Sequence, residues 1–392
     1  MEFKYGFISA DDHVQEHPEV WRRRMSKAKW GERIPHIERQ ADGTERWLVD
    51  GQKIDLPGVA LAGAAMPDRA REPQRWEEVP KIAFMPGERL TAMDVDGVDY
   101  SILYPTVAGR AGETFGRLAD AELELACVQA YNDWLIEEWA AVSPRFVPQC
   151  IVPLAPIDAT VYEIKRAVAK GHRGVVMPAV PMMLRELPHI NESVYDPVWA
   201  TCQDLDVPLC FHAGATRDIQ FPPYAGFSPE VAAAMEAITR PVSTVLVVAN
   251  FLYSQILVRF PRLKVVFAET SLAWGAYELE LADHQFERQR LHTEGYDLLP
   301  SVLFKRQCHL VGWFDSTGLK TRHHIGLDNL LWSTNFPQAT STWPESRQTI
   351  ARCFDGIPAN ERRQVLVANA ARLYNLPRGT DAANSLKTEA TR

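Results

Sequence analysis

Short apolar runs alternate along this chain with longer amphipathic stretches. The apolar runs are rich in β-branched residues and apolar on both faces, as expected of buried parallel strands. They cover residues 3–10, 98–105, 146–154, 174–178, 207–214, 263–269, 308–314 and 329–337. Eight such strands, each followed by a helical pattern, predict an α/β fold with a (β/α)8 TIM barrel. An open doubly wound sheet is the alternative, but no G-x-G-x-x-G turn follows any of the runs.

The stretches between the strands carry helical periodicity. In 157–171, apolar residues recur every three to four positions and Gly171 supplies a C-terminal stop. Residues 117–142 and 359–375 show similar patterns, and the latter predicts a C-terminal helical extension of the barrel.

Two regions fall outside the repeat. Residues of about 30–90 include the sequence IERQADGTERWLVDGQKI, whose alternating runs and Asp-Gly pairs predict a β-hairpin insertion after the first strand. Residues 378–392 form a polar C-terminal tail. We therefore expect one barrel domain over residues 1–377, with the insertion inside it.

Charge and composition limit the kinds of molecule that this protein is expected to bind. The net charge of −8 and the pI of about 5.8 argue against general binding to nucleic acid. The most apolar run, 242–258, is interrupted by polar residues and predicts no membrane span. The first residues show no secretory pattern, so we expect a cytoplasmic protein. The six cysteines are scattered without C-x-x-C spacing, which is typical of packed free thiols.

Polar residues lie where several predicted strands end. Asp11 and His13 form a D-x-H step after the first strand, His212 ends the fifth, Glu269 ends the sixth and Asn335 ends the eighth. Side chains two residues apart share one face of an extended chain. The C-terminal ends of barrel strands meet at one mouth, where the chemistry of such folds occurs. Carboxylate and imidazole together suit Zn, Mn or Fe, so these residues predict a divalent metal site, with Zn as the first expectation.

Several longer segments resemble a known family. They are ISADDHVQEHPEVW (8–21), GERLTAMDVDGVDYSILYPT (87–106), YDPVWATCQDLDVPLCFHAG (195–214), LKVVFAETSLAW (263–274), IGLDNLLWSTNFPQATSTWP (325–344) and VANAARLYNLP (367–377). Together they are similar to the amidohydrolase-related family that includes aminocarboxymuconate-semialdehyde decarboxylase. The resemblance implies a metal-binding barrel with Asp11, His13 and His212 at ligand positions. It implies a base or a second-metal ligand at Glu269.

The end of the eighth strand departs from that family. Relatives usually read S-D-x-P-H, whereas this chain has Asn335 in the acidic position and Gln338 in place of the histidine. An amide offers an oxygen to a cation but cannot serve as a general base. If Asn335 takes the place of a catalytic residue, the usual proton transfer is lost. His309 and His324 are the histidines expected near the same rim.

Two functions remain open at this level. The first is a metal-dependent amidohydrolase-like enzyme, a hydrolase or a non-oxidative decarboxylase, acting on a small carboxylated or amide substrate. In it Glu269 and Asn335 hold the catalytic positions. The alternative is a catalytically degenerate barrel subunit that supports a homologous active subunit, for example that of a dinuclear-metal oxygenase. We expect a homo-oligomer or a hetero-oligomer with such a subunit.

Overall fold

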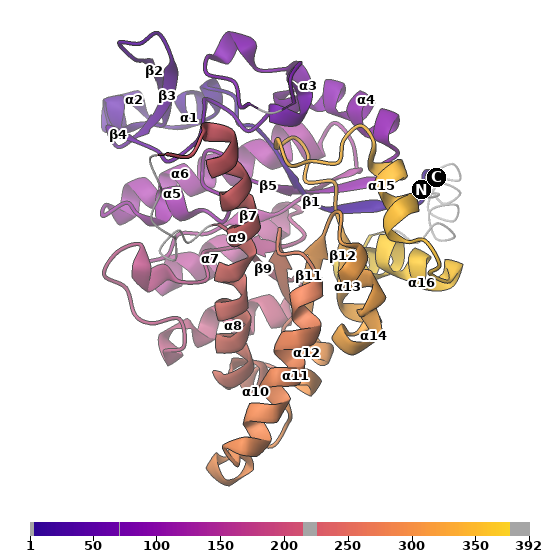
Figure 1. The fold of residues 1–392 in the computed structure, drawn as a ribbon. Coiled ribbons are helices and arrows are strands. Elements are labelled where there is room, and N and C mark those ends of the chain that lie inside the picture. Colours follow the sequence, from indigo (N-terminus) through magenta and orange to yellow (C-terminus); the bar gives the residue numbers. More distant parts are fainter. Residues whose placement is uncertain (1–3, 70, 215–225, 377–392) are drawn as a thin grey trace, which may run out of the picture.

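The computed structural model describes residues 4–69, 71–214 and 226–376. It contains a strand in each of the eight predicted places (Figure 1). These are β1 (Ile8–His13), β5 (Tyr100–Tyr104), β6 and β7 (Phe146–Pro148 and Cys150–Ile151), β8 (Val175–Val176), β9 (Leu209–His212), β10 (Val265–Ala268), β11 (Cys308–Gly312) and β12 (Leu330–Trp332). β6 and β7 are two parts of one strand that is interrupted at Gln149. The predicted α/β fold is confirmed.

The strands form a parallel barrel. One sheet has the order β1-β5-β6, and the other has the order β12-β11-β10-β9-β8-β7. The remaining edges are joined just beyond β12, where the amide of His13 donates to the carbonyl of Phe336 at 2.7 Å and that of Asn335 donates to the carbonyl of Asp11 at 3.2 Å. The C-terminal ends of β1 and β12 are thereby held side by side.

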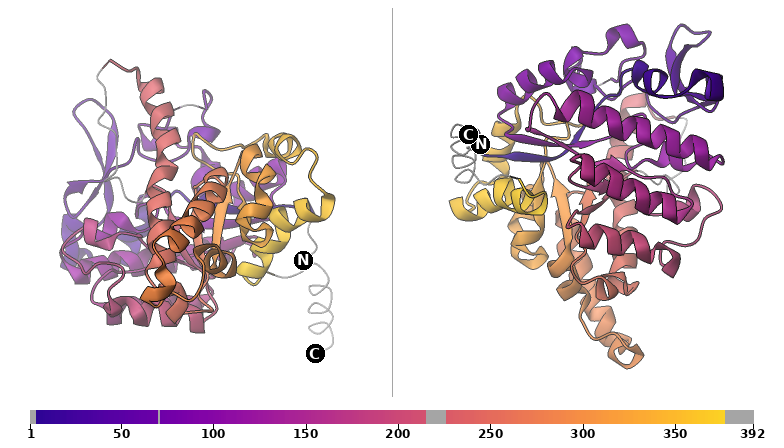
Figure 2. Two further views of the ribbon diagram at one scale, coloured as in Figure 1. Left: turned by 60° about the horizontal axis from the view of Figure 1, so that its bottom comes forward. Right: turned by 180° about the vertical axis from the view of Figure 1, so that it is seen from behind.

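Helices surround the strands (Figures 1 and 2). They are α1 (Glu19–Arg24), α2 (Lys27–Trp30), α3 (Lys81–Phe84), α4 (Pro86–Asp96), α5 (Glu113–Gly116), α6 (Ala121–Trp134), α7 (Ile157–Lys170), α8 (Asp196–Asp204), α9 (Pro229–Tyr253), α10 (Ile256–Arg259), α11 (Ala273–Arg288), α12 (Pro300–Gln307), α13 (Ser316–Lys320), α14 (Arg322–Ile325), α15 (Ser346–Cys353), α16 (Ala359–Arg363) and α17 (Asn369–Leu373). α7 ends at Gly171, as the sequence predicts. The patterns at 117–142 and 359–375 each continue through a π-helical turn, Leu135–Ala140 and Gln364–Ala368.

The predicted insertion contains an antiparallel sheet. It consists of β2 (His36–Arg39), β3 (Glu45–Val49) and β4 (Gln52–Lys53), in that order. The carboxylate of Glu72 fastens the insertion to the barrel, because it accepts hydrogen bonds from the amides of Ala62 and Gly63 and from that of Ala339 beyond β12. The insertion therefore borders the mouth of the barrel. The polar tail 378–392 lies outside the described residues.

α9 is unusual for its length and exposed apolar composition. Its Ser228 cap accepts a hydrogen bond from the amide of Val231, and the helix then runs for 25 residues. By length and composition alone, Ala234–Tyr253 is apolar enough to cross a membrane, a test that core helices of other proteins also pass. Only 22% of this stretch is buried, however. Figure 2 shows the N-terminal part of α9 rising beyond the barrel.

Candidate metal centre

β1 brings Asp11 and His13 to the barrel mouth and turns Asp12 away from them. The register of β1 against β5 shifts between Ser9 and Asp12. Asp12 accepts hydrogen bonds from the hydroxyls of Ser9, Ser101 and Thr334 and from the amide of Phe336. Burial raises the pKa of Asp12 to about 6, against the lowering effect of these donors. Asp12 thus links β1 to β5 and to the segment after β12, while the carboxylate of Asp11 faces the barrel mouth.

Two imidazoles and one carboxylate meet at this mouth. His13 Nδ1 lies 2.8 Å from the carbonyl of Pro105, and His212 Nδ1 lies 2.7 Å from that of Ala213. Each Nδ1 therefore carries the proton in a neutral ring, so that the lone pair is on Nε2. The two Nε2 atoms are 3.1 Å apart, and Asp11 Oδ1 is 3.4 Å from that of His212 and 3.7 Å from that of His13.

These three side chains are suited to hold a positive charge. All three side chains are completely buried, and neither carboxylate oxygen of Asp11 accepts a hydrogen bond from the described residues. Burial, aided by the nearby His212, lowers the pKa of His13 to about 4. Burial also disfavours the charged form of His212, but the neighbouring Asp11 outweighs it and raises the pKa of that ring. Two lone pairs and a carboxylate this close together form a donor set that fits a divalent cation.

Glu269 stands beside this group at the end of β10. Its backbone has a left-handed φ of 53°, which turns the side chain into the mouth. Oε1 accepts hydrogen bonds from Arg240 Nη1 at 2.7 Å and from Asn335 Nδ2 at 3.1 Å, and Oε2 lies 3.8 Å from His212 Nδ1. Burial alone would raise the pKa of Glu269, but Arg240, followed by His212 and Arg110, lowers it to about 2. The carboxylate is therefore ionised and weakly basic.

Both the nitrogen and the oxygen of the Asn335 side-chain amide form hydrogen bonds. Nδ2 donates to Glu269 and, at 2.9 Å, to Thr340 Oγ1, while Oδ1 accepts from Gln338 Nε2 at 3.1 Å. The backbone φ of 57° is left-handed, a conformation that asparagine tolerates well. Asn335 therefore serves as a neutral donor that holds Glu269 in place. Gln338, three residues further along the chain, supports that amide.

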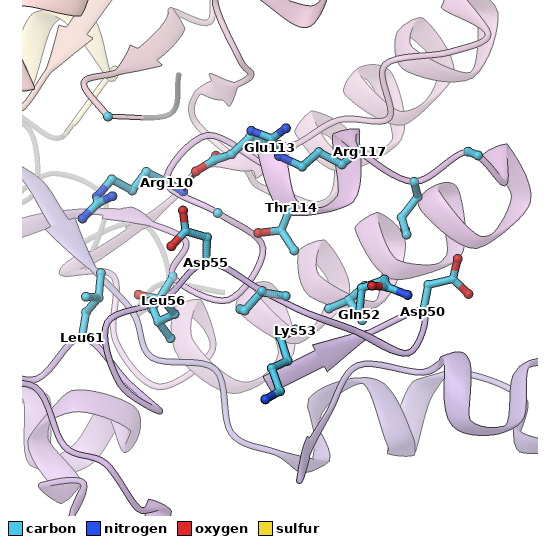
Figure 3. Close-up of a pocket in the computed structure, with 17 residues that line it drawn as sticks. Asp50, Gln52, Lys53, Asp55, Leu56, Leu61, Arg110, Glu113, Thr114 and Arg117 are labelled. Atoms are coloured by element: carbon cyan, nitrogen blue, oxygen red, sulfur yellow. Dashed lines mark hydrogen bonds between the residues drawn. The ribbon is translucent and has the colours of Figure 1, made fainter. Parts of the chain in front are cut away.

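A pocket of about 390 Å³ lies next to the centre, between the insertion and the loop that follows β5 (Figure 3). Its lining includes Thr106, which follows the carbonyl that orients His13, and Gly214, two residues beyond His212. Leu56 and Leu61 form an apolar part of the wall, and Arg110 lies near them with its Nε 3.9 Å from Glu269 Oε2. The volume suits a small organic molecule.

The structure brings together the five residues that the sequence singled out at strand ends. Other candidates lie elsewhere. His309 is buried near the start of β11, where burial lowers its pKa to about 4, and His324 is an exposed residue of α14. Neither compensates for Asn335. The sequence IQFPPYAGF (219–227), after His212, predicts a loop able to line a pocket, but 219–225 of it lie outside the described residues.

Two arginines of this site were missed from the sequence. Arg240 lies on α9, far from any strand end, and Arg110 lies in the loop after β5. A lone arginine in the most apolar helix was the available indication for Arg240. Nothing in the local sequence distinguished Arg110 from an ordinary loop residue.

Comparisons with known proteins agree with this architecture. The amidohydrolase family model matches residues 46–376. An amidohydrolase from Mycobacterium avium subsp. paratuberculosis has a TM-score of 0.72 at 18% identity, covering 95% of this chain and 99% of its own. The 5-carboxyvanillate decarboxylase of Sphingomonas paucimobilis has a TM-score of 0.65 at 18% identity, covering 95% and 100%.

A third solved structure holds a metal. The dihydroxybenzoic acid decarboxylase of Polaromonas sp. JS666, with bound manganese and the inhibitor 2-nitroresorcinol, has a TM-score of 0.63 at 18% identity, covering 96% of this chain and 98% of its own. These likenesses establish the (β/α)8 barrel. A search of curated proteins found no match. Because the family model spans most of the sequence, the chain belongs to the amidohydrolase family.

Proposed function

We propose that this protein is a divalent-metal-dependent enzyme that removes a carboxyl group from a small carboxylated molecule without an oxidant. The observation that carries the proposal is the buried cluster of three metal-binding groups, in which the Nε2 atoms of His13 and His212 lie close to each other and to the carboxylate of Asp11. In this proposal Asp11, His13 and His212 hold the cation. A bound cation would supply a Lewis acid that polarises a substrate oxygen.

The remaining residues position charge around the substrate. Arg240 and Asn335 keep Glu269 ionised and fixed, so Glu269 presents a permanent negative charge to the centre. Arg110 borders both the pocket and Glu269, where its guanidinium can bind a substrate carboxylate. Leu56 and Leu61 offer an apolar wall for the body of the substrate.

Decarboxylation would break the bond between the substrate carbon and its carboxyl group, release CO₂ and place a proton from solvent on the same carbon. Asn335 does not titrate, and the pKa of Glu269 is lowered to about 2, so neither residue supplies that proton at neutral pH, and neither is a strong base toward water for hydrolysis. Two of the similar structures are decarboxylases of aromatic acids, which supports decarboxylation over hydrolysis. Hydrolysis of an amide is the second candidate, since a cation by itself lowers the pKa of water.

Manganese joins zinc as a candidate metal. We expected zinc from the ligand types, whereas the Polaromonas decarboxylase contains manganese. The degenerate-subunit alternative gains no support from the similar structures.

Metal analysis and activity assays test this proposal together. Purified protein should contain close to one divalent transition metal per chain by elemental analysis, and His13→Ala should lose most of it. His324→Ala, which changes an exposed histidine of α14, is the matched control and should keep it.

Chelated protein reloaded with Mn²⁺ or Zn²⁺ should then release CO₂ from a hydroxylated benzoate within a panel of benzoates and amides. Wild-type protein that remains folded and binds no metal would refute the proposal. Ammonia release from the amides without CO₂ release would favour hydrolysis.

A further inference from the structure

A hollow of about 400 Å³ lies where the chain enters β1. Lys4 and Tyr5, which precede that strand, line it together with Arg347 of α15 and Arg362 of α16. Figure 1 shows the two helices beside the N-terminal end of β1, on the side of the molecule away from the insertion. The metal centre lies at the opposite, C-terminal end of β1, so the two sites are separate. We name this feature the N-terminal hollow.

The three cationic side chains of the N-terminal hollow form no ion pair within the residues that the structure describes. The acidic residues nearby bind other groups. Asp94 accepts hydrogen bonds from the hydroxyl of Tyr5 at 3.0 Å and from Arg145 at 2.8 Å. Asp99 accepts from three backbone amides of the segment before β1, and Asp96 accepts from the amide and the hydroxyl of the first residue of α15. The charges of the three cations are therefore available to a ligand.

Tyr5 holds two of these cations next to the hollow. Arg347 Cζ lies 5.2 Å from the centroid of the Tyr5 ring, and Lys4 Nζ lies 4.6 Å from it. Cations at such distances are attracted to the face of an aromatic ring. The side chain of Arg347 also lies against Gly97, where a Cβ would collide with its Nε atom. The position of the Arg347 guanidinium is thus fixed before any ligand binds, which lowers the entropy cost of binding.

We propose that the N-terminal hollow binds a small organic phosphate. Guanidinium groups bind phosphate oxygens in pairs, and a lysine ammonium adds a compact charge. Phe7, Ile350 and Leu366 are buried side chains that also line the hollow, and they offer apolar contact to the body of the ligand. A volume of about 400 Å³ lies in the range of small-molecule sites and is several times that of an inorganic phosphate ion.

The charge of the whole chain argues for a small ligand in this place. The net charge is −8, and proteins that bind nucleic acid present a broad basic surface. Here the cations are confined to one hollow, with Asp94 and Asp99 beside it. A long polyanion would meet repulsion outside the hollow, whereas a single phosphate group meets all three cations.

Binding of phenyl phosphate to the full-length protein tests this proposal. This probe has an aromatic body and carries close to two negative charges at pH 8. Chelator-treated protein is used, so that no cation at the metal centre attracts the phosphate. Titration calorimetry should give a Kd on the order of 0.1 mM, which rises with NaCl because exposed charges are screened. Inorganic phosphate should bind more weakly, and benzyl alcohol should not bind.

Paired arginine variants locate the site. Arg347→Gln and Arg362→Gln should each weaken binding of phenyl phosphate by about tenfold, because each removes a charged hydrogen-bond donor. Arg352→Gln on α15 and Arg363→Gln on α16 are the matched controls, since both arginines are exposed and lie outside the lining of the hollow. They should bind as the wild type does. All four changes are at exposed positions, and equal melting temperatures without ligand would show that the variants are folded.

Three results would each overturn the proposal. The first is a wild-type protein that shows no saturable binding of phenyl phosphate in the millimolar range. The second is unchanged affinity in both Arg347→Gln and Arg362→Gln, which would place the bound phosphate elsewhere. The third is equally tight binding of succinate, which would show that the hollow selects charge without preference for phosphate.

Discussion

Replacing Asn335 with aspartate tests whether a neutral donor is required beside Glu269. Asn335 Nδ2 donates to Glu269 Oε1 at 3.1 Å. Asn335→Asp would place two carboxylates at about that separation. With an effective dielectric constant of about 20, two unit charges at this distance repel by roughly 5 kcal/mol. Arg240 offsets part of this repulsion. We expect the metal-free variant to lose about 3 kcal/mol of its free energy of unfolding at pH 7.

The loss should depend on pH and on metal. Repulsion raises the pKa of the carboxylate pair in the folded state, so the folded variant binds a proton as the pH falls. The stability gap from wild type should therefore narrow between pH 7 and pH 4. Added Mn²⁺ or Zn²⁺ should narrow it at pH 7, since a cation neutralises the pair. The same variant should retain metal more strongly against a chelator than the wild type, by about one to two orders of magnitude.

Urea denaturation with and without chelator measures these effects. The double variant Asn335→Asp with Glu269→Gln provides the control, because it exchanges carboxylate and amide and restores one charge to the pair. It should recover most of the lost stability. A single variant as stable as wild type in chelator, at pH 7, would show that Asn335 does not hold Glu269. Unchanged metal retention would show that position 335 does not contribute to metal binding.

Two further substitutions test charges buried in the fold. Burial raises the pKa of Glu278 on α11 to about 8, so wild-type stability should fall as the pH rises from about 4.5 to 8. Glu278→Gln should remove that fall, gaining about 4 kcal/mol at pH 9 and nothing at pH 4. Parallel curves of melting temperature against pH for the two proteins would contradict this. Arg240→Met should cost about 3–5 kcal/mol at pH 7, because it leaves the ionised Glu269 poorly compensated. The cost should be smaller at pH 3, because without Arg240 the pKa of Glu269 rises and the carboxylate of the variant is protonated there. Equal losses at both pH values would contradict this.

The barrel and the strand-end residues could be predicted because both depend on local pattern. Buried parallel strands are continuous apolar runs, and residues at their C-terminal ends converge wherever the fold closes. The D-x-H spacing likewise places Asp11 and His13 on one face.

The other features of the site depend on tertiary packing, and the sequence alone could not predict them. Asp12 is as good a ligand as Asp11 by type, and only the register shift in β1 turns it toward structural hydrogen bonds. Arg240 reaches Glu269 because α9 folds back over the barrel, 28 residues after His212. The saturation of the Asn335 amide depends on three side chains that no spacing rule relates.

The carbonyl groups of Pro105 and Ala213 that orient His13 and His212 belong to the main chain. Acceptors of this kind survive any side-chain substitution that leaves the local backbone path intact. The orientation of the two imidazole rings thus depends on the backbone path at the barrel mouth and not on the identity of neighbouring side chains. Variation can accumulate around the two histidines, as drift or as new substrate preference, without re-evolving their alignment. Mutational scans should accordingly find tolerance at positions 105 and 213 to replacements that keep the loop geometry, beside near-complete intolerance at positions 13 and 212.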